Sequence, residues 1–170
     1  MAKEGIITLN VDGEDIKAKQ GQTILEAARS SGIYIPSLCY YPGLKPLPQA
    51  IPDEACQLCV VEANGNIVLS CVTPISERMV VKTRTAKVRE LQQKILLAVL
   101  TRQPIEIYPE KKDCELQKVI NHIGLKEISV HVPRSLPPLE DNPFFARDSS
   151  FCILCHRCLR VCDEIRGGTE

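Results

Sequence analysis

The stretch from Cys56 to Cys71 reads CQLCVVEANGNIVLSC and decides the fold of the N-terminal half. Two β-type runs flank Asn64-Gly65, and Asn-Gly in that setting is the strongest short signal for a β-hairpin. A cysteine pair spaced C-x2-C leads into the first run, and Cys71 follows the second. The stretch therefore predicts two antiparallel strands with cysteines at their open end.

The residues before this hairpin predict more of the same sheet. Short strands at 6–11 and 15–18 flank Asp12-Gly13, and a helix begins after Thr23, with Glu26 placed to complete a capping box. Gly32 ends this helix, and residues 79–82 form one more strand. The order β-β-α-loop-β-β-β is typical of a β-grasp domain. Five prolines make residues 33–55 irregular, which leaves backbone N–H groups free to point at sulfur.

Beyond residue 83 the hydrophobic spacing changes to that of a helix. One helix is predicted over 84–101 and a second over 113–122, whereas four prolines mark residues 132–143 as a linker. We therefore expect an α+β fold in four parts: a β-grasp domain at 1–83, a helical segment at 84–131, a linker at 132–147 and a cysteine-bearing segment at 148–170.

Composition excludes several classes of function. Lys plus Arg and Asp plus Glu each number 21, and aromatic residues make up only 4%, so neither net charge nor base stacking favours nucleic-acid binding. No apolar run approaches the roughly 20 residues that a membrane-spanning helix needs, and the N-terminus lacks a signal peptide. We expect a cytoplasmic protein, in which grouped thiols are more often metal ligands than disulfides.

Four of the nine cysteines form a first set with the spacing C-x16-C-x2-C-x11-C. They are Cys39, Cys56, Cys59 and Cys71. Four thiolates suit either a zinc ion or a [2Fe–2S] cluster, so the ligands alone leave both open.

A second set has the spacing C-x2-C-x2-C-x3-C, which is the run of bacterial ferredoxins and predicts a [4Fe–4S] cluster. Its members are Cys152, Cys155, Cys158 and Cys162. In ferredoxins with two clusters the last cysteine of such a run binds the other cluster. The fourth ligand is therefore open: Cys162, a residue elsewhere, or one beyond residue 170.

The residues of the N-terminal half resemble a known family. Thr23 to Ala28, Gly32 to Tyr40 and Phe151 to Glu164 are similar to the N-terminal iron–sulfur region of the large iron–sulfur subunit of respiratory complex I, NAD-linked [FeFe]-hydrogenases and formate dehydrogenases. The resemblance implies a [2Fe–2S] cluster on the first cysteine set. The first gap is longer here than in the family.

The family's middle cluster site, with one histidine and three cysteines, is degenerate in this chain. Gln103-Pro104 replaces the expected His-Pro, and Ile107 and Glu110 stand where two cysteines would be. Cys114 alone remains, and we interpret it as a structural or stray thiol, with the fourth ligand of the C-terminal cluster as the alternative.

The three histidines and the arginines of the C-terminal segment are not interpreted as metal ligands. His156 is interpreted as partly exposed, and His122 and His131 as surface or core-edge residues. Arg157, Arg160 and Arg166 are interpreted as a solvated helix face, with an acidic partner as the alternative.

Two clusters in one chain would relay electrons. The chain has no dinucleotide fingerprint and no catalytic constellation, so it is expected to carry electrons rather than act on a substrate. The resemblance implies two partners, a flavin subunit that binds NAD(H) and a catalytic oxidoreductase subunit. Two alternatives remain: an N-terminal piece of a larger catalytic subunit, or a zinc-stabilised interaction module.

Overall fold

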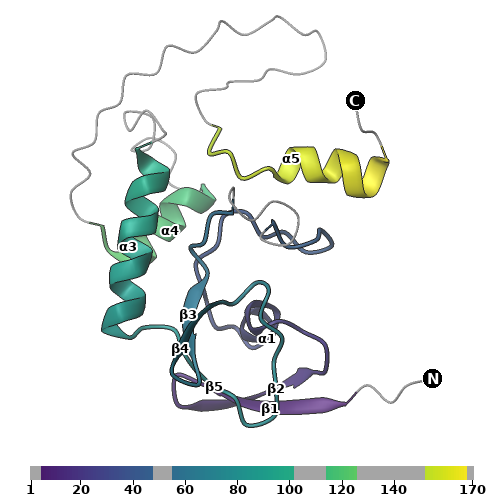
Figure 1. The fold of residues 1–170 in the computed structure, drawn as a ribbon, viewed down its shortest axis with the longest axis vertical. Helices are drawn as coiled ribbons and strands as arrows, with labels where there is room; N and C mark the ends of the chain where they lie inside the picture. Colours follow the sequence, from purple (N-terminus) through teal and green to yellow (C-terminus); the bar gives the residue numbers. More distant parts are fainter. Residues whose placement is uncertain (1–4, 48–54, 102–113, 126–151, 168–170) are drawn as a thin grey trace, which may run out of the picture.

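The computed structural model describes residues 5–47, 55–101, 114–125 and 152–167, and its N-terminal half is a five-stranded mixed sheet (Figure 1). The strands are β1 (Ile6–Val11), β2 (Glu14–Lys19), β3 (Val60–Ala63), β4 (Asn66–Leu69) and β5 (Val80–Lys82). Their order is β2-β1-β5-β3-β4, with β1 parallel to β5 and the other pairs antiparallel.

Both predicted hairpins are present, and the backbone conformation of their turn residues explains why they form. Asp12-Gly13 and Asn64-Gly65 all adopt positive φ, as a two-residue turn of the type that matches strand twist requires. The strands beside Asn64-Gly65 are antiparallel as predicted, and β3 and β4 pair from Val60 with Leu69 to Ala63 with Asn66. The sheet therefore follows from short-range sequence signals, except for the parallel pairing of β1 with β5.

Helix α1 (Ile24–Ser30) begins at the predicted capping box. The Glu26 backbone N–H donates to the Thr23 hydroxyl at 3.3 Å, and the Thr23 N–H donates to the Glu26 carboxylate at 2.8 Å. The apolar side of α1 is fully buried with the inner side chains of the sheet, including Leu9, Val61 and Val81. Sheet and helix together form the core expected of a ferredoxin-type domain.

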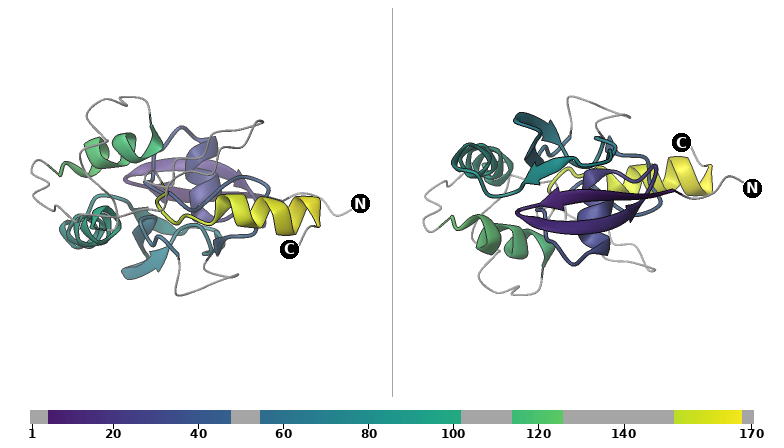
Figure 2. Two further views of the ribbon diagram at one scale, coloured as in Figure 1. Left: turned by 90° about the horizontal axis from the view of Figure 1, so that it is seen from above. Right: turned by 90° about the horizontal axis from the view of Figure 1, so that it is seen from below.

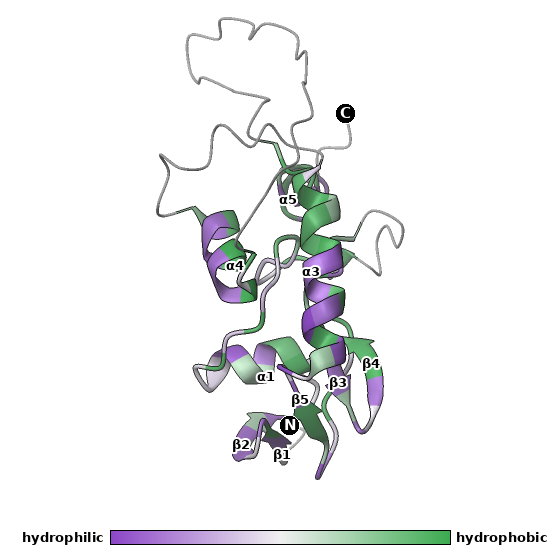
Figure 3. Ribbon diagram, turned by 90° about the vertical axis from the view of Figure 1, so that its left-hand side faces the viewer, coloured by the Kyte–Doolittle hydropathy of each residue, from purple (hydrophilic) through white to green (hydrophobic). Residues whose placement is uncertain are grey.

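A second core joins the helical segment to the cysteine loops. Helix α3 (Ala86–Leu100) and helix α4 (Glu115–Ile123) lie side by side at one edge of the molecule (Figures 1 and 2). Each has apolar and polar portions (Figure 3). The buried members of this core are Leu38, Leu58, Leu96, Leu100, Leu116, Val119 and Ile120. Leu38 and Leu58 each directly precede a cysteine of the first set, so the helices hold the cysteine loops.

The C-terminal segment is a loop followed by α5 (Arg157–Arg160) and the π-helical turn η4 (Val161–Arg166). Both helices lie over the cysteine-bearing end of the sheet domain in Figure 1. Within the described ranges, no helix is both long and apolar enough to cross a bilayer. The predicted linker at 132–147 and the degenerate positions 103–110 lie outside the described residues, so these expectations stay predictions.

Candidate metal centre

The structure brings the four cysteines of the first set together. Cys59 leads into β3 and Cys71 follows β4, so the ladder of this hairpin places them side by side. The Ser70 hydroxyl fixes that end of the hairpin by donating to the Cys59 carbonyl at 2.7 Å. Cys39, Cys59 and Cys71 are buried and Cys56 is half-buried, as suits ligands of a cluster shielded from water.

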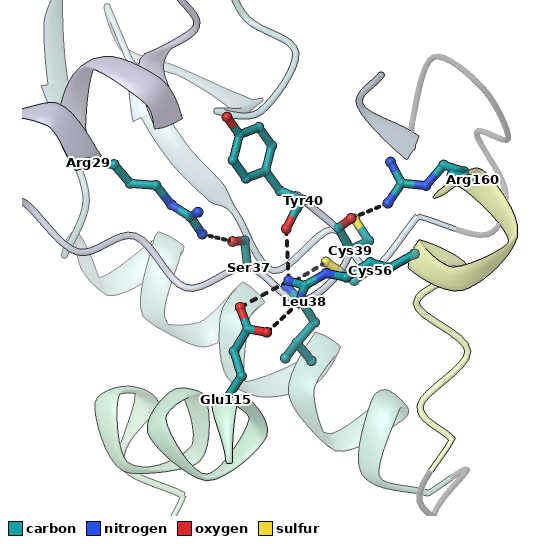
Figure 4. Close-up of polar contacts among 9 residues, drawn as sticks. Arg29, Ser37, Leu38, Cys39, Tyr40, Cys56, Glu115 and Arg160 are labelled. Atoms are coloured by element: carbon teal, nitrogen blue, oxygen red, sulfur yellow. Dashed lines mark hydrogen bonds and ion pairs between the residues drawn. The ribbon is translucent and has the colours of Figure 1, made fainter. Parts of the chain in front are cut away.

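Helix α1 positions the loop that carries Cys39. The Arg29 guanidinium donates to the Ser37 hydroxyl at 2.7 Å (Figure 4). The Tyr40 hydroxyl donates to the Glu26 carboxylate at 3.2 Å. These contacts flank Cys39 on both sides. Burial and the nearby Glu26 carboxylate raise the pKa of Tyr40 to about 12, so its hydroxyl remains a donor.

The four thiols are arranged as two pairs, Cys39 with Cys56 and Cys59 with Cys71. The Cys39 thiol donates to the Cys56 sulfur, which lowers the pKa of Cys56 to about 6 and raises that of Cys39. In the same way, the hydrogen bond from Cys71 lowers the pKa of Cys59 and raises that of Cys71. In each pair the two thiols share a hydrogen bond, and a metal that binds them would displace their protons.

Backbone N–H groups point at these sulfurs, as predicted for the irregular loop. The Leu38 N–H donates to the Cys56 sulfur at 3.5 Å (Figure 4), and the N–H groups of Cys39 and Leu58 also lower the pKa of Cys56. Such hydrogen bonds favour the charged form of a sulfur and help to set cluster potential.

Two thiol pairs fit a [2Fe–2S] cluster, in which each of two irons takes two protein thiolates. A structural zinc site instead needs four ligands around one point. In the described parts of the chain, no three Cys, His, Asp or Glu side chains converge on a position for one metal ion. The arrangement in two pairs is the one that a two-iron cluster uses.

The C-x2-C loops of both sets contain left-handed residues that are not glycine. Gln57 has φ of 56°, Leu154 of 54° and His156 of 56°. This conformation is uncommon for such side chains, and it is found most often at binding and active sites. Gln57 and His156 each directly follow the first cysteine of their loop, whereas Leu154 directly precedes the second cysteine of its loop.

The second set is more open than the first. Cys152 and Cys155 are half-buried, whereas Cys158 in α5 and Cys162 in η4 are exposed. Its four thiols lie within eleven residues, and their chemistry suits iron. The complete ligand set of a four-iron site at this position stays a prediction.

One cavity lies between the two sets. It has a volume of about 180 Å³ and is lined by Cys56 of the first set and Cys155 of the second, together with Leu38, Ile95 and Ile153. Sequence spacing gave no sign of this proximity, because nearly a hundred residues separate the two cysteines.

Cys114 belongs to neither set. It caps α4, where its sulfur accepts a hydrogen bond from the Gln117 N–H at 3.3 Å. This contact gives Cys114 a role in capping α4, and its exclusion from cluster binding stays a prediction. His122 lies on the exposed side of α4, with its ring 4.7 Å from that of Tyr34, and His156 is half-buried; His131 lies outside the described residues.

The interpretation of Arg157 and Arg160 as a solvated face is wrong. Arg160 is only 5% exposed, and its guanidinium donates to the carbonyls of Lys45, at 2.5 Å, and of Cys39 (Figure 4). Arg157 forms a two-point ion pair with Glu115 and donates to the Tyr40 carbonyl at 2.8 Å. Both side chains pack α5 against the Cys39 loop, while Arg166 is exposed as predicted.

Comparison with known proteins agrees with this geometry. Residues 5–86 match the family described as 2Fe-2S iron-sulfur cluster binding domain. The chain is 31% identical to the NADP-reducing hydrogenase subunit HndD of Solidesulfovibrio fructosivorans, over 95% of this chain and 28% of the relative. It is 30% identical to a component of the NADH-quinone oxidoreductase of Rhizobium meliloti, over 95% of this chain and 19% of that protein.

A chain of a solved structure is also similar to this protein. A crystal structure of an NAD+-reducing [NiFe]-hydrogenase in the H2-reduced state contains a chain with a TM-score of 0.76 and 31% sequence identity, covering 92% of this chain and 65% of that one. The present chain spans less than a third of the length of the two curated relatives.

Proposed function

Because residues 5–86 match the family described as 2Fe-2S iron-sulfur cluster binding domain, we propose that this chain is an electron-transfer module of an NAD-linked oxidoreductase. Cys39, Cys56, Cys59 and Cys71 would hold a [2Fe–2S] cluster, and Cys152, Cys155, Cys158 and Cys162 would supply the ligands for a [4Fe–4S] cluster. When bound, each cluster would accept and donate one electron at a time.

The observation that carries this proposal is the closeness of the two cysteine sets. Cys56 and Cys155 line one cavity, and Arg160 of the second segment contacts the carbonyl of Cys39. Two clusters bound on either side of one cavity could exchange electrons without any movement of the chain. The burial of the first set keeps water from its sulfurs, while the exposed second set can face a partner.

The partners proposed are a flavin subunit that binds NAD(H) and a catalytic oxidoreductase subunit. This rests on the relatives, which are a subunit of an NADP-reducing hydrogenase and a subunit of NADH-quinone oxidoreductase. Whether the catalytic part lies in a separate chain or continues from this segment, residues 5–167 would play the same role of relaying electrons. The domain boundaries at residues 83, 131 and 147 belong to this proposal.

The test is metal and sulfide analysis of the chain after anaerobic reconstitution, with the visible spectrum recorded on the same sample. The proposal expects a brown protein with iron and acid-labile sulfide in equal amounts, two of each on the first set and four of each on the second. Cys114→Ala is the matched control, because it removes a thiol outside both sets and should leave the iron content unchanged. A colourless protein that binds zinc in place of iron would refute the proposal in favour of an interaction module.

A further inference from the structure

Arg157 lies between the two cysteine sets. It follows Cys155 by two residues, and its guanidinium reaches across to the loop of the first set, where it donates to the Tyr40 carbonyl at 2.8 Å. Burial by itself would lower the pKa of Arg157, but the Glu115 carboxylate raises it, and so do the sulfurs of Cys155 and Cys39. One cation therefore lies two residues from Cys155 and bonds to the carbonyl of the residue that follows Cys39.

Three hydrogen bonds fix the position of the Arg157 guanidinium, two to the Glu115 carboxylate and one to the Tyr40 carbonyl. The Glu115 carboxylate pairs with the Arg157 guanidinium at 2.5 and 2.9 Å, and the side chain of Arg157 is only 23% exposed. Arg160, one helical turn later, is buried and anchors α5 by donating to the carbonyls of Cys39 and Lys45. A guanidinium has the planar fork that such two-point contacts need, which the lysine ammonium lacks.

The positive charge of Arg157 affects how easily the two clusters can be reduced. A cluster held by four thiolates is anionic, and one-electron reduction adds a further negative charge. Two such clusters on either side of one cavity repel each other's added electron, and the repulsion is strong where water is excluded. A fixed positive charge between the clusters lowers the free-energy cost of adding an electron to either one. The negative charge of the Glu115 carboxylate partly cancels this effect.

We propose that Arg157, with Glu115 as its counter-ion, raises the reduction potentials of both clusters by holding a positive charge between them. This inference rests on the proposed function, since it requires both clusters to be present. It makes Arg157 and Glu115 positioning residues for electron transfer, although neither is a cluster ligand.

The experiment is a redox titration of the reconstituted full chain, followed by EPR, in Arg157→Gln and Glu115→Gln. At the wild-type midpoint, Arg157→Gln should lower the ratio of reduced to oxidised cluster about tenfold, which is 59 mV for one electron. Glu115→Gln should change the ratio in the opposite direction, because the glutamine oxygen can still accept from Arg157 while the opposing charge is gone.

The opposite signs separate charge from structure. If the ion pair only held α5 in place, both substitutions would weaken the same contact, Glu115→Gln less than Arg157→Gln, and any shifts in potential would have the same direction. Lys94 and Glu90 on α3 offer a matched exposed pair, 2.6 Å apart with side chains 70% and 66% exposed. Lys94→Gln and Glu90→Gln should leave both midpoints unchanged, because solvent and salt screen exposed charges.

Three results would overturn the inference. The reduction potentials could shift with the same sign in the two variants, or no further than in the Lys94 and Glu90 controls. The third is a lower ratio of reduced to oxidised cluster in Glu115→Gln. If Arg157→Gln fails to assemble clusters, the sign measured in Glu115→Gln alone decides. A wild-type chain that binds no iron is a different result, because it refutes the proposed function itself.

Discussion

Leu96→Ala tests whether the helical segment and the cysteine loops form one cooperative unit. The Leu96 side chain is fully buried in α3, in the same core as Leu38 and Leu58, which directly precede Cys39 and Cys59. Truncating a buried leucine costs about 3 kcal/mol, from lost transfer free energy and the cavity left behind. If opening of the cysteine loops requires this core to open, the open population rises roughly a hundredfold, since about 1.4 kcal/mol is a factor of ten.

The assay is the rate at which the reconstituted protein loses iron to a chelator under argon, together with thermal unfolding followed by circular dichroism. We expect iron loss up to about a hundredfold faster, and a Tm lower by roughly 6–12 °C for a chain of this size. Leu97→Ala is the control, because the neighbouring Leu97 is 39% exposed and its truncation should change stability little. The reasoning is refuted if Leu96→Ala lowers the Tm but releases iron at the rate of Leu97→Ala.

Two further substitutions probe the roles of single residues. Cys114→Ala should lower stability by about 0.5–1 kcal/mol through loss of the α4 cap, Cys114→Ser should recover it, and iron content should not change in either; thermal unfolding with iron analysis checks this. Loss of iron in Cys114→Ser would make this thiol a ligand. At Gln57, where φ is 56°, valine should cost roughly 1–3 kcal/mol and lower cluster occupancy, whereas glycine should be neutral. Equal iron content and unfolding curves for the valine and glycine variants would show that the backbone there is not constrained.

Much of the fold was accessible from the sequence because it depends on local signals. Asn64-Gly65 predicted a hairpin whose turn residues adopt the required positive φ, and Thr23 with Glu26 predicted a capping box with both hydrogen bonds present. The predicted helix over 84–101 is α3, from Ala86 to Leu100. Each of these features depends on residues within a few positions of one another.

The contacts that the sequence did not reveal join distant parts of the chain. Arg160 reaches the carbonyl of Cys39 across 121 positions, and Arg157 pairs with Glu115 across 42. Arginine in a short polar helix ordinarily faces solvent, so only the packing of α5 on the Cys39 loop distinguishes these two from the exposed Arg166. Spacing grouped the cysteines into two sets, but it gave neither the pairing within the first set nor the cavity shared with the second.

The central claim is that the two cysteine sets independently hold two different clusters. EPR of the chemically reduced protein, recorded for the wild type, Cys59→Ala and Cys155→Ala, tests it most directly. The account predicts two signals in the wild type, with the two-iron signal lost from Cys59→Ala alone and the four-iron signal lost from Cys155→Ala alone. A single signal in the wild type, or loss of both signals from either variant, would contradict it.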